Sequence, residues 1–286
     1  MRYIFGVTRV VIGLVVMVWA VTNWALVSHA AWSLNTPESQ TGVLWAGENL
    51  VWNDNRLGSF DIFNRDAAGI ISPLLTGVGD QTVLAAEKKS LLVSDTASGN
   101  QSLYIYGLEN HVLKPLGKYP SVTSSSIFAD QAAWSDGAIV WWWDGQKIIS
   151  RPFLSQQLLV TPAGLFIMEN DQISVWSNEA DQIITCLTCV KMVPYYDQIA
   201  FLDGAGTLTL WPSDTNIDSS VSALLSNQSS LVYQTAETTF VYRDQQKIQY
   251  NQVIKPNAQI SQSAFASIEK LDIVLEPILP PIVQLS

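Results

Sequence analysis

VLWAGENLVWND, residues 43–54, is the stretch that decides the fold. Two apolar runs, at 43–46 and 50–52, flank the polar turn at 47–49, and Asp54 ends the second run. Short runs rich in β-branched and aromatic residues, separated by a turn that contains glycine, are typical of two antiparallel strands. The stretch therefore predicts a β-hairpin.

The same hairpin pattern occurs six times along the chain. Its acidic or amide end-points fall at residues 54, 95, 136, 170, 203 and 244, at steps of 41, 41, 34, 33 and 41 residues. Further aromatic and β-branched runs follow the end-points, as at 103–106 and 173–176. A period near 40 residues that contains strands and no helical stretch is that of one four-stranded propeller blade.

Stacking such blades in a closed ring buries both faces of each sheet, which a single blade cannot do. A β-sandwich also contains many short strands, but it does not explain six copies at near-constant phase. We therefore predict an all-β fold, a six-bladed β-propeller, over residues 43–258. Residues 31–42 are expected to be a linker. Residues 259–286, with three prolines after residue 276, are expected to be a tail outside the repeat, with one candidate strand at 271–275.

One known family has a similar repeat. Residues 51–63, VWNDNRLGSFDIF, have an apolar-Trp-x-Asp end, then Arg-x-Gly, then Asp-Ile-Phe, and residues 93–106 are similar in outline. In this motif the chain resembles the TolB-like propeller family. Later repeats keep the hairpin and lose the Arg-x-Gly turn, so the pattern extends from residue 43 to about 255 while the specific motif is clear once. The resemblance implies a propeller fold and a binding or periplasmic assembly role.

Residues 1–30 have the features of an export signal. Arg2 and Arg9 precede Val10–Val27, a run without charged residues, and small residues at 28–30 suit cleavage before Ala31. The run is also about as long as a membrane-spanning helix requires, so a retained N-terminal apolar helix that anchors the chain is the alternative. In both cases the positive N-terminus stays inside and the rest of the chain lies outside the cytoplasm.

Charge excludes one class of partner. The 286 residues include 15 basic and 25 acidic side chains, and the part after residue 30 has 13 basic against 25 acidic, a formal charge of −12. Nucleic-acid phosphates and anionic lipids are bound by clustered Lys and Arg, so this surface is not expected to bind nucleic acid.

Two groups of residues are candidates for a binding surface. The acidic end-points are expected to lie on one face of the ring and to suit a cation or a polyol: Asp54, with Arg56 beside it, Asp95, Asp136, Asp203 and Asp244. The alternative is that each Asp accepts backbone N–H groups of its own turn, which is common in tight turns. Trp141 and Trp143 share one face of a strand, where they either pack between blades or stack on a sugar or a partner protein.

No catalytic constellation is visible in the sequence. Cys186 and Cys189 are the only cysteines, and outside the cytoplasm a disulfide is expected ahead of reduced thiols or redox chemistry. His111 stands alone after residue 30, and no G-x-S-x-G, H-E-x-x-H or phosphate-binding glycine loop occurs. We therefore expect no catalytic, cofactor-binding or metal-binding residues, and a protein that is not an enzyme.

These observations lead to two functional hypotheses. The first is a non-enzymatic extracytoplasmic propeller, periplasmic, secreted or anchored at a membrane, that binds or scaffolds protein partners in an envelope assembly. The second is a secreted propeller that binds or hydrolyses glycans. The second predicts a central pocket with two carboxylates about 5 to 10 Å apart beside an exposed Trp.

Overall fold

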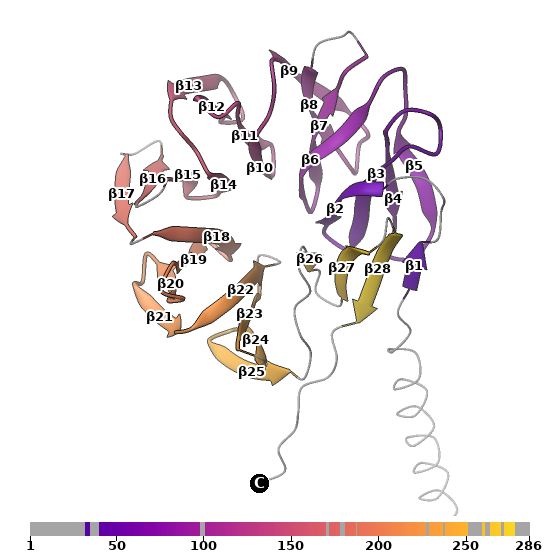
Figure 1. Ribbon diagram of the computed structural model, residues 1–286. Helices are drawn as coiled ribbons and strands as arrows, with labels where there is room; N and C mark the ends of the chain where they lie inside the picture. Colours follow the sequence, from indigo (N-terminus) through magenta and orange to yellow (C-terminus); the bar gives the residue numbers. More distant parts are fainter. Residues whose placement is uncertain are drawn as a thin grey trace, which may run out of the picture.

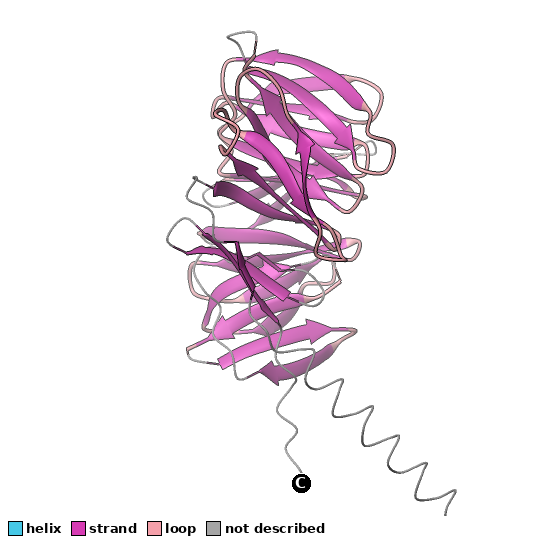
Figure 2. Cartoon of the chain, turned by 90° about the vertical axis from the view of Figure 1, so that its right-hand side faces the viewer, coloured by secondary structure: helices cyan, strands magenta, loops and turns pink. Residues whose placement is uncertain are grey.

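The computed structural model describes residues 32–34, 40–97, 101–169, 172–177, 181–186, 188–226, 229–236 and 238–250, and strands at 259–260, 264–269 and 272–277. All regular structure in these residues is β-strand, as Figure 2 shows with the ring turned by 90° from the view of Figure 1. Seven antiparallel four-stranded sheets are present.

Six of the sheets are meanders of consecutive strands. The first three are made of β2 (Gln40–Ala46), β3 (Asn49–Asp54), β4 (Asp61–Arg65) and β5 (Ile71–Leu75); β6 (Gln81–Glu87), β7 (Ser90–Asp95), β8 (Gln101–Gly107) and β9 (Leu113–Tyr119); and β10 (Ser124–Phe128), β11 (Gln131–Ser135), β12 (Ile139–Trp143) and β13 (Ile148–Pro152). The next three are made of β14 (Gln157–Thr161), β15 (Gly164–Met168), β16 (Gln172–Trp176) and β17 (Gln182–Thr185); β18 (Cys189–Tyr195), β19 (Gln198–Asp203), β20 (Leu208–Trp211) and β21 (Thr215–Asp218); and β22 (Val221–Ser226), β23 (Leu231–Thr235), β24 (Thr238–Arg243) and β25 (Gln246–Tyr250).

The seventh sheet joins the two ends of the described chain. Its strands are β26 (Gln259–Ile260), β27 (Ala264–Glu269), β28 (Asp272–Pro277) and, paired with β28, β1 (Trp32–Leu34). β26 contacts both β22 and β2, so this sheet lies between the sixth sheet and the first (Figure 1). The ring is therefore closed by a strand from the N-terminal side.

The all-β propeller fold and its six repeated four-stranded sheets are confirmed, and the described chain adds a seventh four-stranded sheet outside the predicted range 43–258. The regions predicted as a linker at 31–42 and as a tail at 259–286 contain β1 and the start of β2, and β26 to β28, respectively. The repeat does not reveal this sheet because its strands come from two distant segments. The predicted strand at 271–275 corresponds to β28.

The ring has two faces that differ in their turns. Turns after the first and third strand of a repeated sheet, such as 47–48 and 196–197, lie on one face, here named the odd-turn face. Turns after the second strand and links between sheets, such as 55–60 and 76–80, lie on the other, the even-turn face. This follows because successive antiparallel strands run in opposite directions.

The sixth repeat was predicted out of phase. Residues 54, 95 and 203 are the last residues of the second strand in their sheets, and residue 136 comes directly after its second strand. Asp244 instead follows β24, which is the third strand of its sheet. Asp244 therefore lies on the odd-turn face, opposite to the other acidic end-points. The error arises because β23 and β24 form a hairpin that resembles the earlier ones in sequence.

The core consists of layers between neighbouring sheets. Val51 and Ile62 of the first sheet pack with Leu91 and Val93 of the second. Inner strands are buried on both sides, so β15, GLFIM, is buried at all five positions. This double burial explains why the middle strands are continuous apolar runs instead of alternating ones.

The predicted signal or anchor at residues 1–30 lies outside the described residues. Within the described part of the chain, no helix is long and apolar enough to cross a membrane.

Candidate functional site

The even-turn acids bond to their own turns. Asp54 is fully buried and accepts hydrogen bonds from Arg56 Nε, Nη2 and backbone N, and from Trp52 Nε1. Asp95 accepts the backbone N–H of Ala97. Asp136 accepts those of residues 138 and 139. These contacts favour the turn-capping interpretation of Asp54, Asp95 and Asp136 over a ligand site.

The Asp54 carboxylate is stabilised in its charged form. Burial alone would raise its pKa, but the hydrogen bonds from Arg56 and Trp52 outweigh burial and lower the pKa below its ordinary value of 3.8. The Arg56 guanidinium also lies 4.4 Å from the centre of the Phe63 ring. Arg56 is thus a structural partner of the first blade.

We expect Arg56→Ala to lower the free energy of unfolding by about 2–3 kcal/mol at pH 7, because it leaves a buried carboxylate without its cation. A carboxylate whose folded pKa is depressed stabilises the fold above its unfolded pKa and loses that contribution as the pH falls through the folded value. Denaturant unfolding of the chain and of Asp54→Asn from pH 7 to pH 3 would measure this. Asp54→Asn should flatten the acid side of the profile, and Arg56→Ala should cost less in that background. Equal profiles would contradict the assignment.

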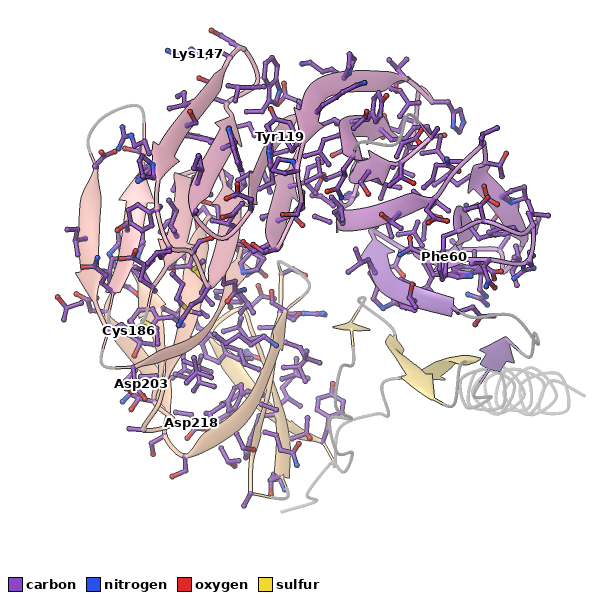
Figure 3. All side chains as sticks on the ribbon, turned by 45° about the horizontal axis from the view of Figure 1, so that its top comes forward. Phe60, Tyr119, Lys147, Cys186, Asp203 and Asp218 are labelled. Atoms are coloured by element: carbon purple, nitrogen blue, oxygen red, sulfur yellow. A yellow bond between two sulfur atoms is a disulfide. The ribbon has the colours of Figure 1, made fainter. Side chains whose placement is uncertain are left out.

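Trp141 and Trp143 pack between blades. Trp141 stacks on Trp134 at 6.4 Å and meets Tyr119 edge-on at 5.1 Å between ring centres. Lys114 Nζ lies 4.2 Å from the centre of the Trp143 ring. Figure 3 labels Tyr119 at this boundary between the second and third sheets. The packing interpretation is therefore favoured over an exposed binding surface for both tryptophans.

Cys186 and Cys189 are joined by a disulfide across the link from β17 to β18. Both cysteines are buried in the core layer around Phe166 and Met192. His111 lies in the turn before β9, with its Nδ1 2.7 Å from the Tyr106 hydroxyl. In the described residues, no group of three or more His, Cys, Asp or Glu side chains is placed to hold a metal ion.

Two hollows lined by described residues open on the odd-turn face. One, here named the acidic hollow, has a volume of about 580 Å³ and is lined by residues of the turns at 195–198, 210–215 and 242–245. It lies between the fifth and sixth sheets. Its walls include the rings of Tyr195 and Tyr242, and its charged lining residues are two carboxylates.

The acidic hollow is bridged between the two sheets. Tyr196 Oη donates a hydrogen bond to Asp244 Oδ1 at 2.7 Å. This bond to Asp244 raises the pKa of the Tyr196 phenol, and burial raises that of Tyr195. Both phenols are therefore neutral at physiological pH and present uncharged ring faces.

The second hollow, here named the neutral hollow, has a volume of about 390 Å³ and lies across the third, fourth and fifth sheets. Trp142 and Trp211 line it together with Gln131, Gln182 and the turn at 162–164. No charged side chain lines it among the described residues. Aromatic rings and side-chain amides are therefore the groups that this hollow presents to a ligand.

The described chain also enters and leaves the ring on this face. Trp32, the first residue of β1, pairs with Leu275 near the end of β28, and Leu34 pairs with Ile273 near its start. β28 is the third strand of its sheet counted from the inside, so its end lies on the odd-turn face. β1 therefore begins on the face that has both hollows.

The sequence prediction missed both hollows. Their residues come from several separate turns, those of Tyr196 and Asp244 being 48 positions apart, and no local motif joins them. One signal was present in the sequence. Tyr196 is the first residue of a two-residue turn in the fifth sheet, and the equivalent position in the first sheet is Gly47. A bulky residue at a position suited to glycine is a departure that a repeat alignment could detect.

Fold and hollows together define a β-propeller with a hollowed odd-turn face. No family model matches the chain, and no curated protein matches it. Streptogramin B lyase resembles it in fold with a TM-score of 0.52 at 12% identity, covering 86% of this chain and 97% of that chain.

Two further solved structures have the same kind of likeness. The acylaminoacyl peptidase of Pyrococcus horikoshii matches with a TM-score of 0.57 at 7% identity, covering 80% of this chain and 49% of that one. A third match is the extracellular domain of a chain described as a hybrid two-component system from B. thetaiotaomicron. Its TM-score is 0.53 at 11% identity, and the match covers 87% of this chain and 39% of that one. Likeness at this identity supports the propeller fold, and membership of the TolB-like family stays a prediction.

Proposed function

We propose that this chain is a non-enzymatic, extracytoplasmic β-propeller that binds a protein partner on its odd-turn face within a membrane or envelope assembly. The observation that carries the proposal is the presence of two hollows, between neighbouring sheets, on that one face. Concave sites lined by rings with a few polar groups are where proteins bind ligands and the anchoring side chains of partners.

Two features support the compartment and the orientation. A disulfide between Cys186 and Cys189 suits an oxidising compartment. β1 begins on the odd-turn face. We propose that a membrane anchor in residues 1–30 would precede the ring on this side, where a partner in the same assembly would meet it.

Photo-crosslinking tests this proposal in the full chain in its native membranes. A photoreactive amino acid at Ser213, exposed at the acidic hollow, is expected to capture a discrete protein partner. The matched control position is Val78, 82% exposed on the even-turn face. Capture at Val78 alone, or no protein adduct at either position, would contradict the proposal.

Glycan binding is the second candidate function. The observation that favours it is the neutral hollow, because tryptophan rings and glutamine amides are groups that stack on and hydrogen-bond to sugars. The arrangement differs from the predicted one, since this hollow lies between sheets and its lining residues include no carboxylate. Sugar-dependent protection of Trp211 fluorescence from quenching would support glycan binding over partner binding.

A further inference from the structure

The acidic hollow has an aromatic wall made of three tyrosines. The ring centres of Tyr195 and Tyr196 are 4.9 Å apart with planes at 72°, and those of Tyr195 and Tyr242 are 5.7 Å apart at 46°. Tyr196 is 46% exposed, so part of its ring is open to a ligand. Neutral tyrosine rings present a negative face that attracts cations.

The backbone of this wall is in an unfavourable conformation. Tyr196 has φ of 53°, in the left-handed region, where the first sheet has Gly47 at 65°. Asp244 and Gln245, in the facing turn, have φ of 49° and 62°. A non-glycine residue in this region costs on the order of 1 kcal/mol, and such strain gathers at functional sites. A tyrosine at a glycine-like position therefore points to a use for its side chain.

The charged side chains that line the hollow are both negative. Asp197 and Asp244 line it, and no Lys, Arg or His does so among the described residues. Arg243 is the neighbouring cation, and its Nε is bonded to Ser230 Oγ at 2.5 Å. The chain after residue 30 has a net charge of −12, which adds a long-range attraction for a positive ligand.

A metal ion does not fit these residues. In the described part of the chain, no three His, Cys, Asp or Glu side chains are grouped closely enough to hold one. A hard cation such as Ca²⁺ takes six to eight oxygen ligands. An organic cation fits this lining instead, because it can stack on the aromatic rings and form ion pairs with one or two carboxylates.

We propose that the acidic hollow binds the guanidinium of an arginine side chain presented by the protein partner; this rests on the proposed function and names the chemistry of its site. The planar guanidinium stacks on a tyrosine ring and donates paired hydrogen bonds to a carboxylate, whereas a lysine ammonium does only the second as a point charge. The Tyr196–Asp244 bond holds one ring and one carboxylate together for this purpose.

The probe is a set of short blocked peptides, Gly-Gly-X-Gly-Gly, in which X is arginine, lysine or citrulline, titrated into the full chain. Citrulline keeps the shape of arginine and removes its charge. We expect arginine to bind at least threefold more tightly than lysine, citrulline to bind at least tenfold more weakly than arginine, and added salt to weaken arginine binding.

Two variants remove the site with little risk to folding. Tyr196→Gly deletes the ring and relaxes the backbone, because glycine accepts the left-handed region. Asp244→Asn deletes the charge and keeps a residue that tolerates positive φ. Each is expected to weaken the arginine peptide about tenfold. Asp130→Asn, an exposed acid in the turn after the first strand of the third sheet and so on the same face, is the control and should have no effect.

The outcomes separate this inference from the proposed function. Equal binding of the arginine and citrulline peptides, or binding unchanged in Tyr196→Gly, would overturn the inference. A Ser213 crosslink that persists in Asp244→Asn would also overturn it and would leave the proposed partner intact. If both variants lose arginine binding and the Ser213 crosslink is also lost, the result would support the inference and the proposed function together.

Discussion

A chain that begins at Gln40, and so lacks β1, is expected to melt about 5–10 °C below one that begins at Ala31. β1 supplies the last strand of the seventh sheet through the pairs from Trp32 with Leu275 to Leu34 with Ile273. Each lost backbone hydrogen bond is worth about 1 kcal/mol, and the open edge of β28 would be left unpaired. Thermal unfolding followed by circular dichroism measures the difference.

Hydrogen exchange locates the same effect. Without β1, amides of β27 and β28 should lose protection before those of the first six sheets, because a propeller depends on contacts between neighbouring blades. The chain that begins at Ala31 is the matched control, since it lacks the same export segment and keeps the closing strand. Unchanged protection at residues 264–277 would show that β1 does not close the ring.

Trp134→Ala is expected to lower the free energy of unfolding by about 3–5 kcal/mol. Trp134 is fully buried in β11, stacked on Trp141 and edge-on to Tyr119 at 4.9 Å between ring centres. Removing it leaves a void at the boundary between the second and third sheets, which neighbouring rings fill only in part. Guanidinium unfolding monitored by circular dichroism gives the loss.

A phenylalanine at the same position makes the prediction more specific. The buried Trp134 Nε1 has no hydrogen-bond partner among the described residues. Trp134→Phe keeps most of the ring and removes this donor, so it should cost less than half of the alanine loss. At Trp52, equally buried, Nε1 donates to Asp54, and Trp52→Phe should cost more than Trp134→Phe. The reverse order would contradict this account.

Local pattern decides the blades, and the sequence shows them clearly. Hairpins such as β2–β3 and β10–β11 depend on neighbouring residues, so the alternation of apolar runs and turns predicts them directly. The capping of turns by Asp54, Asp95 and Asp136 is equally local, because an Asp side chain bonds to N–H groups two or three residues away.

The blade count and the phase of the last repeat are not local. β1 pairs with a strand about 240 residues later, and nothing in a three-residue segment such as Trp32–Leu34 marks it for that partner. The hairpin of β23 and β24 has the same apolar pattern as the hairpins one strand earlier in other sheets. The position of this hairpin in its sheet depends on which strand is innermost in the ring. Because β22 is the first strand of that sheet, β24 is the third, and Asp244 lies on the odd-turn face.

The sequence by itself determined a repeated all-β architecture with an acidic surface, since period, turn residues and charge are properties of the chain. Only the tertiary structure decided that the ring has a seventh sheet and that Tyr196 meets Asp244 across two sheets. The physical reason is that strand pairing over long separations and contacts between turns of different blades depend on ring closure. Ring closure brings together residues that no stretch of the sequence links.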